Sequence, residues 1–230
     1  MSQQRWTAVD DYITHALLEP DEALDAALAA SDAAGLPAIA VSPAQGKLLN
    51  LLASMVNARR ILEFGTLGGY STIWLARALP PDGRLTTLEY EQKHAEVARV
   101  NIAKAGLAEL VDVRVGAALD TLPLLALELK AGHVDPFDLV FIDADKEHNA
   151  DYFAASVPLT RPGGVIIVDN VVRGGDVIDA RSENSAVQGT RRLIQTLSTQ
   201  PRVSATAIQT VGAKGYDGFA IAIVGKSASS

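Results

Sequence analysis

The first sixty residues have the hydrophobic spacing of helices. Trp6, Val9, Ile13 and Leu17 recur every three or four residues, which predicts an amphipathic helix, and the alanine-rich stretch 21–34 predicts a second. Ser42 and Pro43 combine an N-cap residue with a proline at the first helical position, so we expect a third helix to begin there. Its inward face is expected to hold four apolar residues, Leu48, Leu51, Leu52 and Met55.

From residue 60 onward, short apolar runs alternate with amphipathic stretches, a pattern typical of strands and helices in turn. We expect strands near 60–64, 84–89, 111–115, 137–142, 164–169, 203–209 and 218–224, and helices near 71–79, 91–105, 117–130, 147–157 and 186–199. This order predicts an α/β fold with a seven-stranded, mostly parallel sheet that carries helices on both faces. Because only the loop 210–217 separates the last two strands, they must form an antiparallel hairpin.

Length and composition narrow the class of protein. A chain of 230 residues is predicted to form a single domain over 1–230, with extra N-terminal helices over 1–57 and an α/β core over 58–226. The absence of cysteine excludes disulfides, thiolate metal ligands and a cysteine nucleophile, so any metal must have oxygen or nitrogen ligands.

Charge and hydropathy suggest a small-molecule partner. The net charge is −7 with no basic cluster, so we expect no nucleic acid partner. We also expect no membrane partner, because no apolar run approaches the roughly 20 residues of a membrane span. The first 19 residues contain Asp10 and Asp11 and no continuous apolar core, so we expect no signal peptide and a cytoplasmic protein. The N-terminal helices are interpreted as a cover for the site or as the contact of a homodimer.

An acidic residue and a glycine-rich turn follow the first predicted strand. Gly65, Gly68 and Gly69 precede a helix, where close backbone approach and free N–H groups are typical of a cofactor site. The spacing differs from a dinucleotide fingerprint, and Glu63 would repel phosphate. A cationic ligand such as S-adenosylmethionine suits it better. Glu89, at the end of the second strand, is the candidate acceptor for ribose hydroxyls. The alternative interpretation is a plain turn beside ordinary solvated strand ends.

Polar residues also follow two later strands. Asp143, Asp145 and Lys146 come directly after the strand near 137–142, and Asp169 and Asn170 end the strand near 164–169. Because ligands of open parallel sheets bind at the carboxyl ends of strands, these groups are expected to lie beside the glycine turn. Asp143, Asp169 and Asn170 are hard oxygen ligands that suit Mg²⁺, with Mn²⁺ or Ca²⁺ as alternatives. The competing interpretation is that they are loop residues, with Asp145 as a helix N-cap.

These motifs together resemble the cation-dependent O-methyltransferases, the class I, Rossmann-like family that includes catechol and caffeoyl-CoA O-methyltransferases. The resemblance extends from about Ile39 to Val224. It implies that Asp143, Asp169 and Asn170 hold the metal and that Lys146 lies close to the accepting hydroxyl. It further implies a set of residues around S-adenosylmethionine, which with Gly69 of the glycine turn forms our predicted cofactor site: Val41, Glu63, Gly65, Thr66, Gly69, Ser71, Glu89, Ala118 and Asp145.

The activity implied is metal-assisted methylation of a small catechol-like or phenolic substrate. A divalent ion would acidify and orient a hydroxyl, and Lys146 is the expected catalytic residue, as a proton acceptor or as a cation beside the oxyanion. The loop 171–189 is interpreted as a substrate lid. Two alternatives stay open: a non-catalytic cofactor-binding module, and an NAD(P)-dependent reductase, for which the sequence lacks the glycine spacing.

Overall fold

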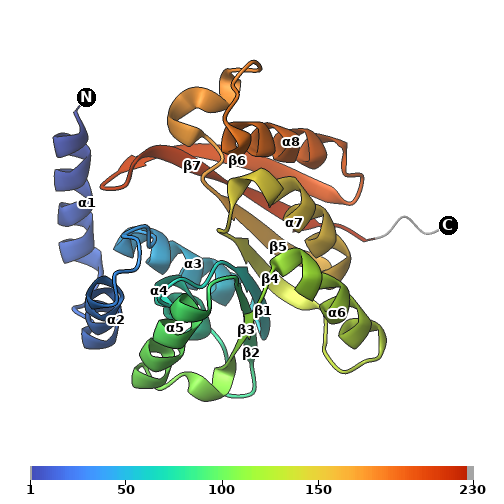
Figure 1. Ribbon diagram of the computed structural model, residues 1–230, viewed down its shortest axis with the longest axis horizontal. Helices are drawn as coiled ribbons and strands as arrows, with labels where there is room; N and C mark the ends of the chain where they lie inside the picture. The colour runs from blue at the N-terminus through green and yellow to red at the C-terminus, as the bar shows by residue number, and fades with distance from the viewer. Residues whose placement is uncertain (1, 227–230) are drawn as a thin grey trace.

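A seven-stranded sheet with the order β3-β2-β1-β4-β5-β7-β6 forms the centre of the protein in the computed structural model, which describes residues 2–226 (Figure 1). The strands are β1 (Arg60–Phe64), β2 (Arg84–Glu89), β3 (Val111–Val115), β4 (Phe137–Ile142), β5 (Thr160–Asp169), β6 (Val203–Gly212) and β7 (Gly215–Val224). The first five strands pair in parallel, whereas β7 pairs antiparallel with both β5 and β6. The predicted fold class is therefore confirmed.

Eight α-helices accompany the sheet within residues 2–226. They are α1 (Gln3–Leu17), α2 (Glu22–Ala33), α3 (Pro43–Met55), α4 (Tyr70–Ala76), α5 (Gln92–Lys104), α6 (Ala118–Lys130), α7 (Asn149–Ser156) and α8 (Ser185–Thr199). Short 3₁₀ turns include η2 (Lys146–His148) and η4 (Arg173–Ile178). None of the helices in the described part of the chain combines the length and apolar character needed to span a bilayer.

Side chains that alternate along the strands pack into two hydrophobic cores, one on each face of the sheet. One core joins Phe64 and Ile142 to α6, α7 and α8. The other joins Ile61 and Phe141 to α2, α3, α4 and α5. Figure 1 shows these two helical layers on opposite sides of the strands, with α1 apart from them beside the far end of the β6–β7 hairpin. The carboxyl ends of the parallel strands are left free between the layers.

The inward face of α3 differs from the one predicted. Leu51 is 47 % exposed and Met55 75 % exposed, whereas Leu49 is 2 % exposed. The reason is close packing through small residues, because a side chain at Gly46 would collide with the indole of Trp74 on α4. Apolar spacing alone does not reveal a helix interface made by glycine.

The hairpin at the end of the chain also differs from the prediction. Residues 210–217 were expected to form a loop, but β6 continues to Gly212 and β7 begins at Gly215. Gly215 has a φ of 98°, a conformation that glycine adopts without steric cost. A two-residue turn, Ala213-Lys214, therefore joins two strands of ten residues each.

Candidate active site

A cavity of about 710 Å³ opens at the carboxyl ends of the parallel strands. The glycine turn after β1 forms one part of its wall, and the residues that follow β4 and β5 form another. Segments distant in sequence complete it, namely 36–43 before α3 and the turn between β6 and β7. This position is the usual one for ligands of doubly wound sheets, and the volume lies in the range of small-molecule sites.

The glycine turn is shaped by contacts that only glycine permits. Gly65 has a φ of 87°, and a Cβ there would collide with the backbone oxygen of Asp143. Gly69 also has a positive φ, 83°, and occupies the N-cap position of α4. The turn thus brings the end of β1 against the end of β4, which places most of the predicted cofactor residues and Asp143 on one cavity.

Glu89 anchors the same turn from β2. Its Oε2 accepts hydrogen bonds from the backbone N–H groups of Thr66 at 3.0 Å and Leu67 at 2.8 Å. Its Oε1 accepts from the N–H of Glu91 at 2.9 Å and lies 3.3 Å from His94 Nδ1. Glu89 lines the cavity with a 6 % exposed side chain. The predicted ribose acceptor is therefore also the support of the turn.

Glu63 lies beneath the cavity wall and is not part of its lining. It is fully buried, and its carboxylate accepts hydrogen bonds from Thr72 Oγ1 at 2.5 Å and Ser71 Oγ at 2.7 Å. Burial raises the pKa of Glu63 to about 7, against the opposing effect of the two hydroxyl bonds. Ser71, which does line the cavity, stands between Glu63 and a bound ligand.

The acidic groups after β4 and β5 come together as predicted. Lys146 Nζ donates to Asp143 Oδ1 at 2.6 Å. Asp143 and Asp169 directly follow Ile142 and Val168, which are paired in the neighbouring strands β4 and β5. Burial and the charge of Asp143 raise the pKa of Asp169 to about 7. Asn170, with a φ of 57°, follows Asp169 and lines the cavity.

A hard divalent cation fits this set of donors. Asp169 is 6 % exposed, and its Oδ2 is held by the amide of Gln45 at 2.7 Å while its Oδ1 accepts from the N–H of Asn170 at 2.8 Å. Two carboxylates and an amide oxygen at one site match the ligand preference of Mg²⁺, Mn²⁺ and Ca²⁺. A bound cation would also relieve the repulsion between the carboxylates, which Lys146 relieves in part here.

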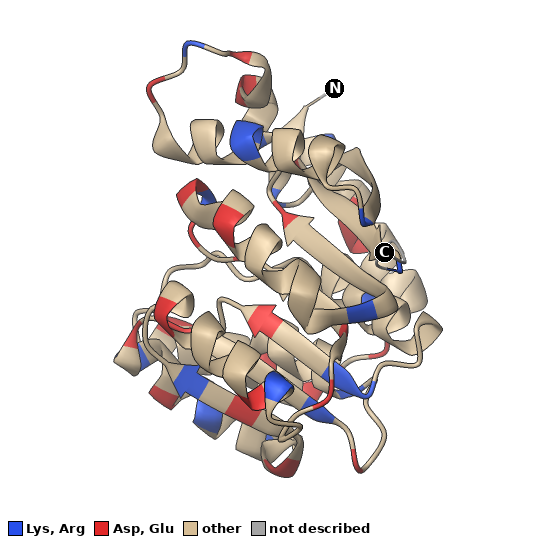
Figure 2. Cartoon of the chain, turned by 90° about the vertical axis from the view of Figure 1, so that its right-hand side faces the viewer, with Lys and Arg blue, Asp and Glu red and all other residues tan. Residues whose placement is uncertain are grey.

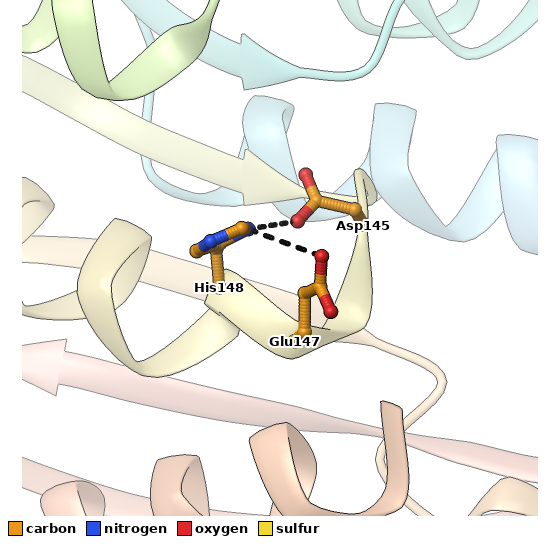
Figure 3. Close-up of side chains that lie close together, drawn as sticks. All are labelled: Asp145, Glu147 and His148. Atoms are coloured by element: carbon orange, nitrogen blue, oxygen red, sulfur yellow. Dashed lines mark hydrogen bonds and ion pairs between the residues drawn. The ribbon is translucent and has the colours of Figure 1, made fainter. Parts of the chain in front are cut away.

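A second group of possible ligands lies at the rim (Figure 3). Asp145, Glu147 and His148 bring one ligand atom each within 4.8 Å of one another. However, Asp145 and Glu147 are exposed, unlike Asp169, and Asp145 already contacts His148 Nδ1 and accepts a hydrogen bond from Tyr152 Oη at 2.5 Å. Burial acts to raise the pKa of Asp145, but these hydrogen bonds outweigh it and leave the pKa below its ordinary value. These contacts and the exposure of the acidic side chains account for the cluster without a bound ion.

Most of the predicted site residues line the cavity. Those that do are Val41, Gly65, Thr66, Ser71, Glu89, Asp143, Asp145, Lys146 and Asn170. Four do not: Glu63 and Asp169 lie behind the wall, Gly69 caps α4, and Ala118 begins α6 and packs against the core. From the predicted lid 171–189, Arg173 belongs to the wall, and α8 begins within that segment at Ser185.

Sequence reasoning missed four residues of this region. Gln45 contacts Asp169, Tyr152 contacts Asp145, and Lys214 lines the cavity from the β6–β7 turn. His94 also lines the cavity beside Glu89. None of these belongs to a motif, and each reaches the site through tertiary packing.

The family model described as O-methyltransferase matches residues 19–220 of the chain. The chain therefore belongs to the O-methyltransferase family, and the predicted family and enzyme class are confirmed.

Individual relatives cover nearly the whole chain. A catechol O-methyltransferase from Mycobacterium tuberculosis is 57 % identical over 216 residues, 94 % of each protein. The O-methyltransferase TomG from Streptomyces achromogenes, solved in complex with SAM, is 52 % identical with a TM-score of 0.93 and coverage of 98 % of this chain and 100 % of that one. An O-methyltransferase from Bacillus cereus, solved with SAH, is 53 % identical with a TM-score of 0.93 and coverage of 97 % and 100 %.

Proposed function

We propose that the protein transfers the methyl group of S-adenosylmethionine to one hydroxyl of a small catechol-like phenol, with Mg²⁺ as the divalent cation and Mn²⁺ or Ca²⁺ as alternatives. The observation that carries the proposal is the position of Asp143 and Asp169 at the ends of the neighbouring strands β4 and β5, with Lys146 Nζ 2.6 Å from Asp143 Oδ1. Asp143, Lys146 and Asn170 line the same cavity as the glycine turn. The relatives described above, which include a catechol O-methyltransferase and proteins bound to SAM or SAH, support it.

The glycine turn and its surroundings suit the cofactor. The backbone at Gly65 and Thr66 offers close approach, and the acidic Glu89 on the wall favours a cationic ligand over a phosphate. Glu89 Oε1 has capacity left for a ribose hydroxyl in addition to its bond from Glu91. Ser71 is proposed to relay the negative charge of Glu63 toward the ammonium of the methionine part.

The acceptor end is formed by Asp143, Asp169, Asn170 and Lys146. A divalent cation bound there supplies acidity and orientation to a vicinal diol. A divalent cation held there would weaken the attraction between Asp143 and the Lys146 ammonium. Nζ could then lose a proton to solvent and, as a neutral amine, accept the proton of the reacting hydroxyl, or it could remain a cation beside the oxyanion. The cavity walls exclude water while the methyl group passes from sulfur to oxygen in a single displacement.

A homodimer is part of the proposal. The support for it is the outer face of α1, where Val9, Tyr12 and Leu17 are 50 %, 76 % and 74 % exposed. Large apolar residues grouped on one helix are typical of a protein contact. Light scattering on the wild type and on the double variant Tyr12→Ser, Leu17→Ser tests it, and a wild-type mass of one chain would contradict it.

The central experiment is radiolabelled methyl transfer from S-adenosylmethionine to a panel of catechols and caffeoyl esters. We expect activity to vanish in EDTA and to return with Mg²⁺ or Mn²⁺. Asp169→Ala should abolish that rescue, whereas Lys146→Ala should still bind metal and cofactor but turn over about 100-fold more slowly. Lys104→Ala, a change on the exposed end of α5, is the matched control. Full activity in EDTA would refute the metal-dependent mechanism.

A further inference from the structure

Two basic side chains stand at the acceptor end of the cavity and have no role in the proposed chemistry. Arg173 follows the metal-binding segment after β5, and Lys214 lies in the β6–β7 turn. Near the glycine turn, the cavity wall instead holds the acidic residues Asp32 and Glu89. Asp32 lies close to this turn because its neighbour Ser31 packs against Gly68. Over the molecule, acidic and basic residues are interspersed and the net charge is −7, so a basic pair on a cavity wall is a local feature (Figure 2).

Arg173 is held in an unusual conformation with donor capacity to spare. Its φ is 57°, a left-handed conformation that a residue with a side chain adopts only at a steric cost. Asp217 Oδ1 stabilises this backbone by accepting from the N–H groups of Val172 at 2.9 Å and Arg173 at 3.0 Å. The guanidinium lies 3.8 Å from Asp217 Oδ2, and its buried Nε has no hydrogen-bond partner. The fold thus holds a guanidinium on the cavity wall whose hydrogen-bond donors are not all used by the protein.

Lys214 is placed by α1. Gln3 Nε2 donates to the carbonyl oxygens of Gly212 at 2.9 Å and Ala213 at 3.2 Å, and Asp10 Oδ2 accepts from the N–H of Ala213 at 2.6 Å. Figure 1 shows the tip of the β6–β7 hairpin reaching α1. Lys214 Nζ donates to the backbone oxygen of Ala38 at 3.2 Å, and among residues 2–226 no carboxylate oxygen lies within ion-pair distance of it. Two of its three donors are therefore available.

From this arrangement we infer that Arg173 and Lys214 bind a carboxylate carried by the acceptor, so that the preferred substrate is a small catechol with an acidic side arm. The inference rests on the proposed function and specifies its substrate class. The proposed cation would neutralise the carboxylates of Asp143 and Asp169 at the acceptor end, which leaves Arg173 and Lys214 as charged partners for a carboxylate on the substrate. The apolar wall at Ile39, which is 67 % exposed, suits the ring between the diol and the carboxylate.

The size of the cavity favours a free acid over a coenzyme A thioester. The volume of about 710 Å³ has to hold the adenosyl cofactor as well as the acceptor. Cavities of about 300 to 1,000 Å³ hold drug-sized ligands, so a coenzyme A thioester would extend beyond this cavity. The phosphates of a thioester would lie outside the described wall.

The test compares kcat/KM for a carboxylated catechol, 3,4-dihydroxybenzoate, with that for neutral catechol, using the full chain with Mg²⁺. In the wild type we expect the carboxylated substrate to be favoured. Lys214→Gln should reduce the ratio of the two kcat/KM values by about tenfold or more, the effect of losing a hydrogen bond to a charged group. Lys214→Arg should restore most of the ratio, and Arg173→Gln should reduce it as Lys214→Gln does.

The control variant is Lys104→Gln, which removes an exposed lysine away from the cavity and should leave the ratio unchanged. Equal use of both catechols by the wild type, or an unchanged ratio in Lys214→Gln, would overturn the inference while leaving the proposed function intact. Preference for caffeoyl-CoA over free caffeate would also overturn it, because phosphate would then be the anion recognised. Failure of the wild type to methylate any catechol would instead count against the proposed function.

Discussion

Gln45, near the start of α3, donates a 2.7 Å hydrogen bond to Oδ2 of Asp169 at the end of β5. Because this bond fixes the direction of a buried carboxylate, Gln45→Ala should weaken divalent metal binding by about tenfold, the usual effect of removing a partner of a metal ligand. Calorimetric titration of the EDTA-treated protein with Mn²⁺ measures it. Gln92→Ala, on the exposed side of α5, is the control, and equal affinities of the two variants would remove Gln45 from the site.

Glu89→Ala should weaken the binding of S-adenosylhomocysteine by about 1 to 3 kcal/mol, because ribose hydroxyls and the turn lose a common charged acceptor. The variant Glu89→Gln keeps one acceptor oxygen for the N–H groups of Thr66 and Leu67 and should lose less. Calorimetry in EDTA separates these effects from the metal. Wild-type affinity in Glu89→Ala would place the ribose elsewhere, and Glu91→Ala serves as a neighbouring exposed control.

Gly65 and Gly106 provide a matched pair for the glycine turn. Both have positive φ values, 87° and 75°, but a Cβ at Gly65 would collide with the Asp143 oxygen whereas Gly106 has open space around it. Gly106→Ala should cost about 1 kcal/mol of unfolding free energy, the backbone effect alone. Gly65→Ala should cost clearly more and reduce cofactor binding. Urea denaturation of both variants is the measurement, and equal losses would show that the contact with β4 is unimportant.

The buried carboxyl of Glu63 should make stability depend on pH. Its pKa rises from 4.5 in the unfolded chain to about 7 in the folded protein, so the folded state holds the proton more tightly. The stabilisation is complete below pH 4.5 and decreases by up to about 1.4 kcal/mol per pH unit as the pH rises toward 7. Glu63→Gln removes this dependence, so the variant should gain stability over the wild type between pH 5 and 8.

Denaturation curves of wild type and Glu63→Gln at several pH values check this expectation. Asp169, whose pKa is also raised to about 7, titrates in both proteins and cancels in the difference. A constant difference from pH 5 to 8 would mean that Glu63 is ionised throughout in the folded protein.

The sequence predicted most of the sheet because its strands are continuous apolar runs that end in polar residues. The same logic located Asp143 and Asn170, since strand ends in a parallel sheet share one edge. Sequence reasoning was less accurate where the local structure depends on contacts between segments that are distant in sequence. The predicted loop 210–217 is longer than the observed turn, because the pattern gives no sign that glycine allows a two-residue turn there. The burial of Glu63 under Ser71 likewise depends on how α4 packs.

Because the β6–β7 turn is attached to α1, different parts of the chain position Lys214 and the proposed reacting groups. The groups that we propose to act on the reacting hydroxyl follow β4 and β5, whereas the position of Lys214 depends on Gln3 and Asp10, near the N-terminus. We therefore expect a substitution in α1 to change which acceptor is preferred without changing the groups at the proposed reacting centre. Exchanging α1 for the corresponding segment of a related O-methyltransferase is therefore expected to change the preferred acceptor without changing the proposed reacting centre.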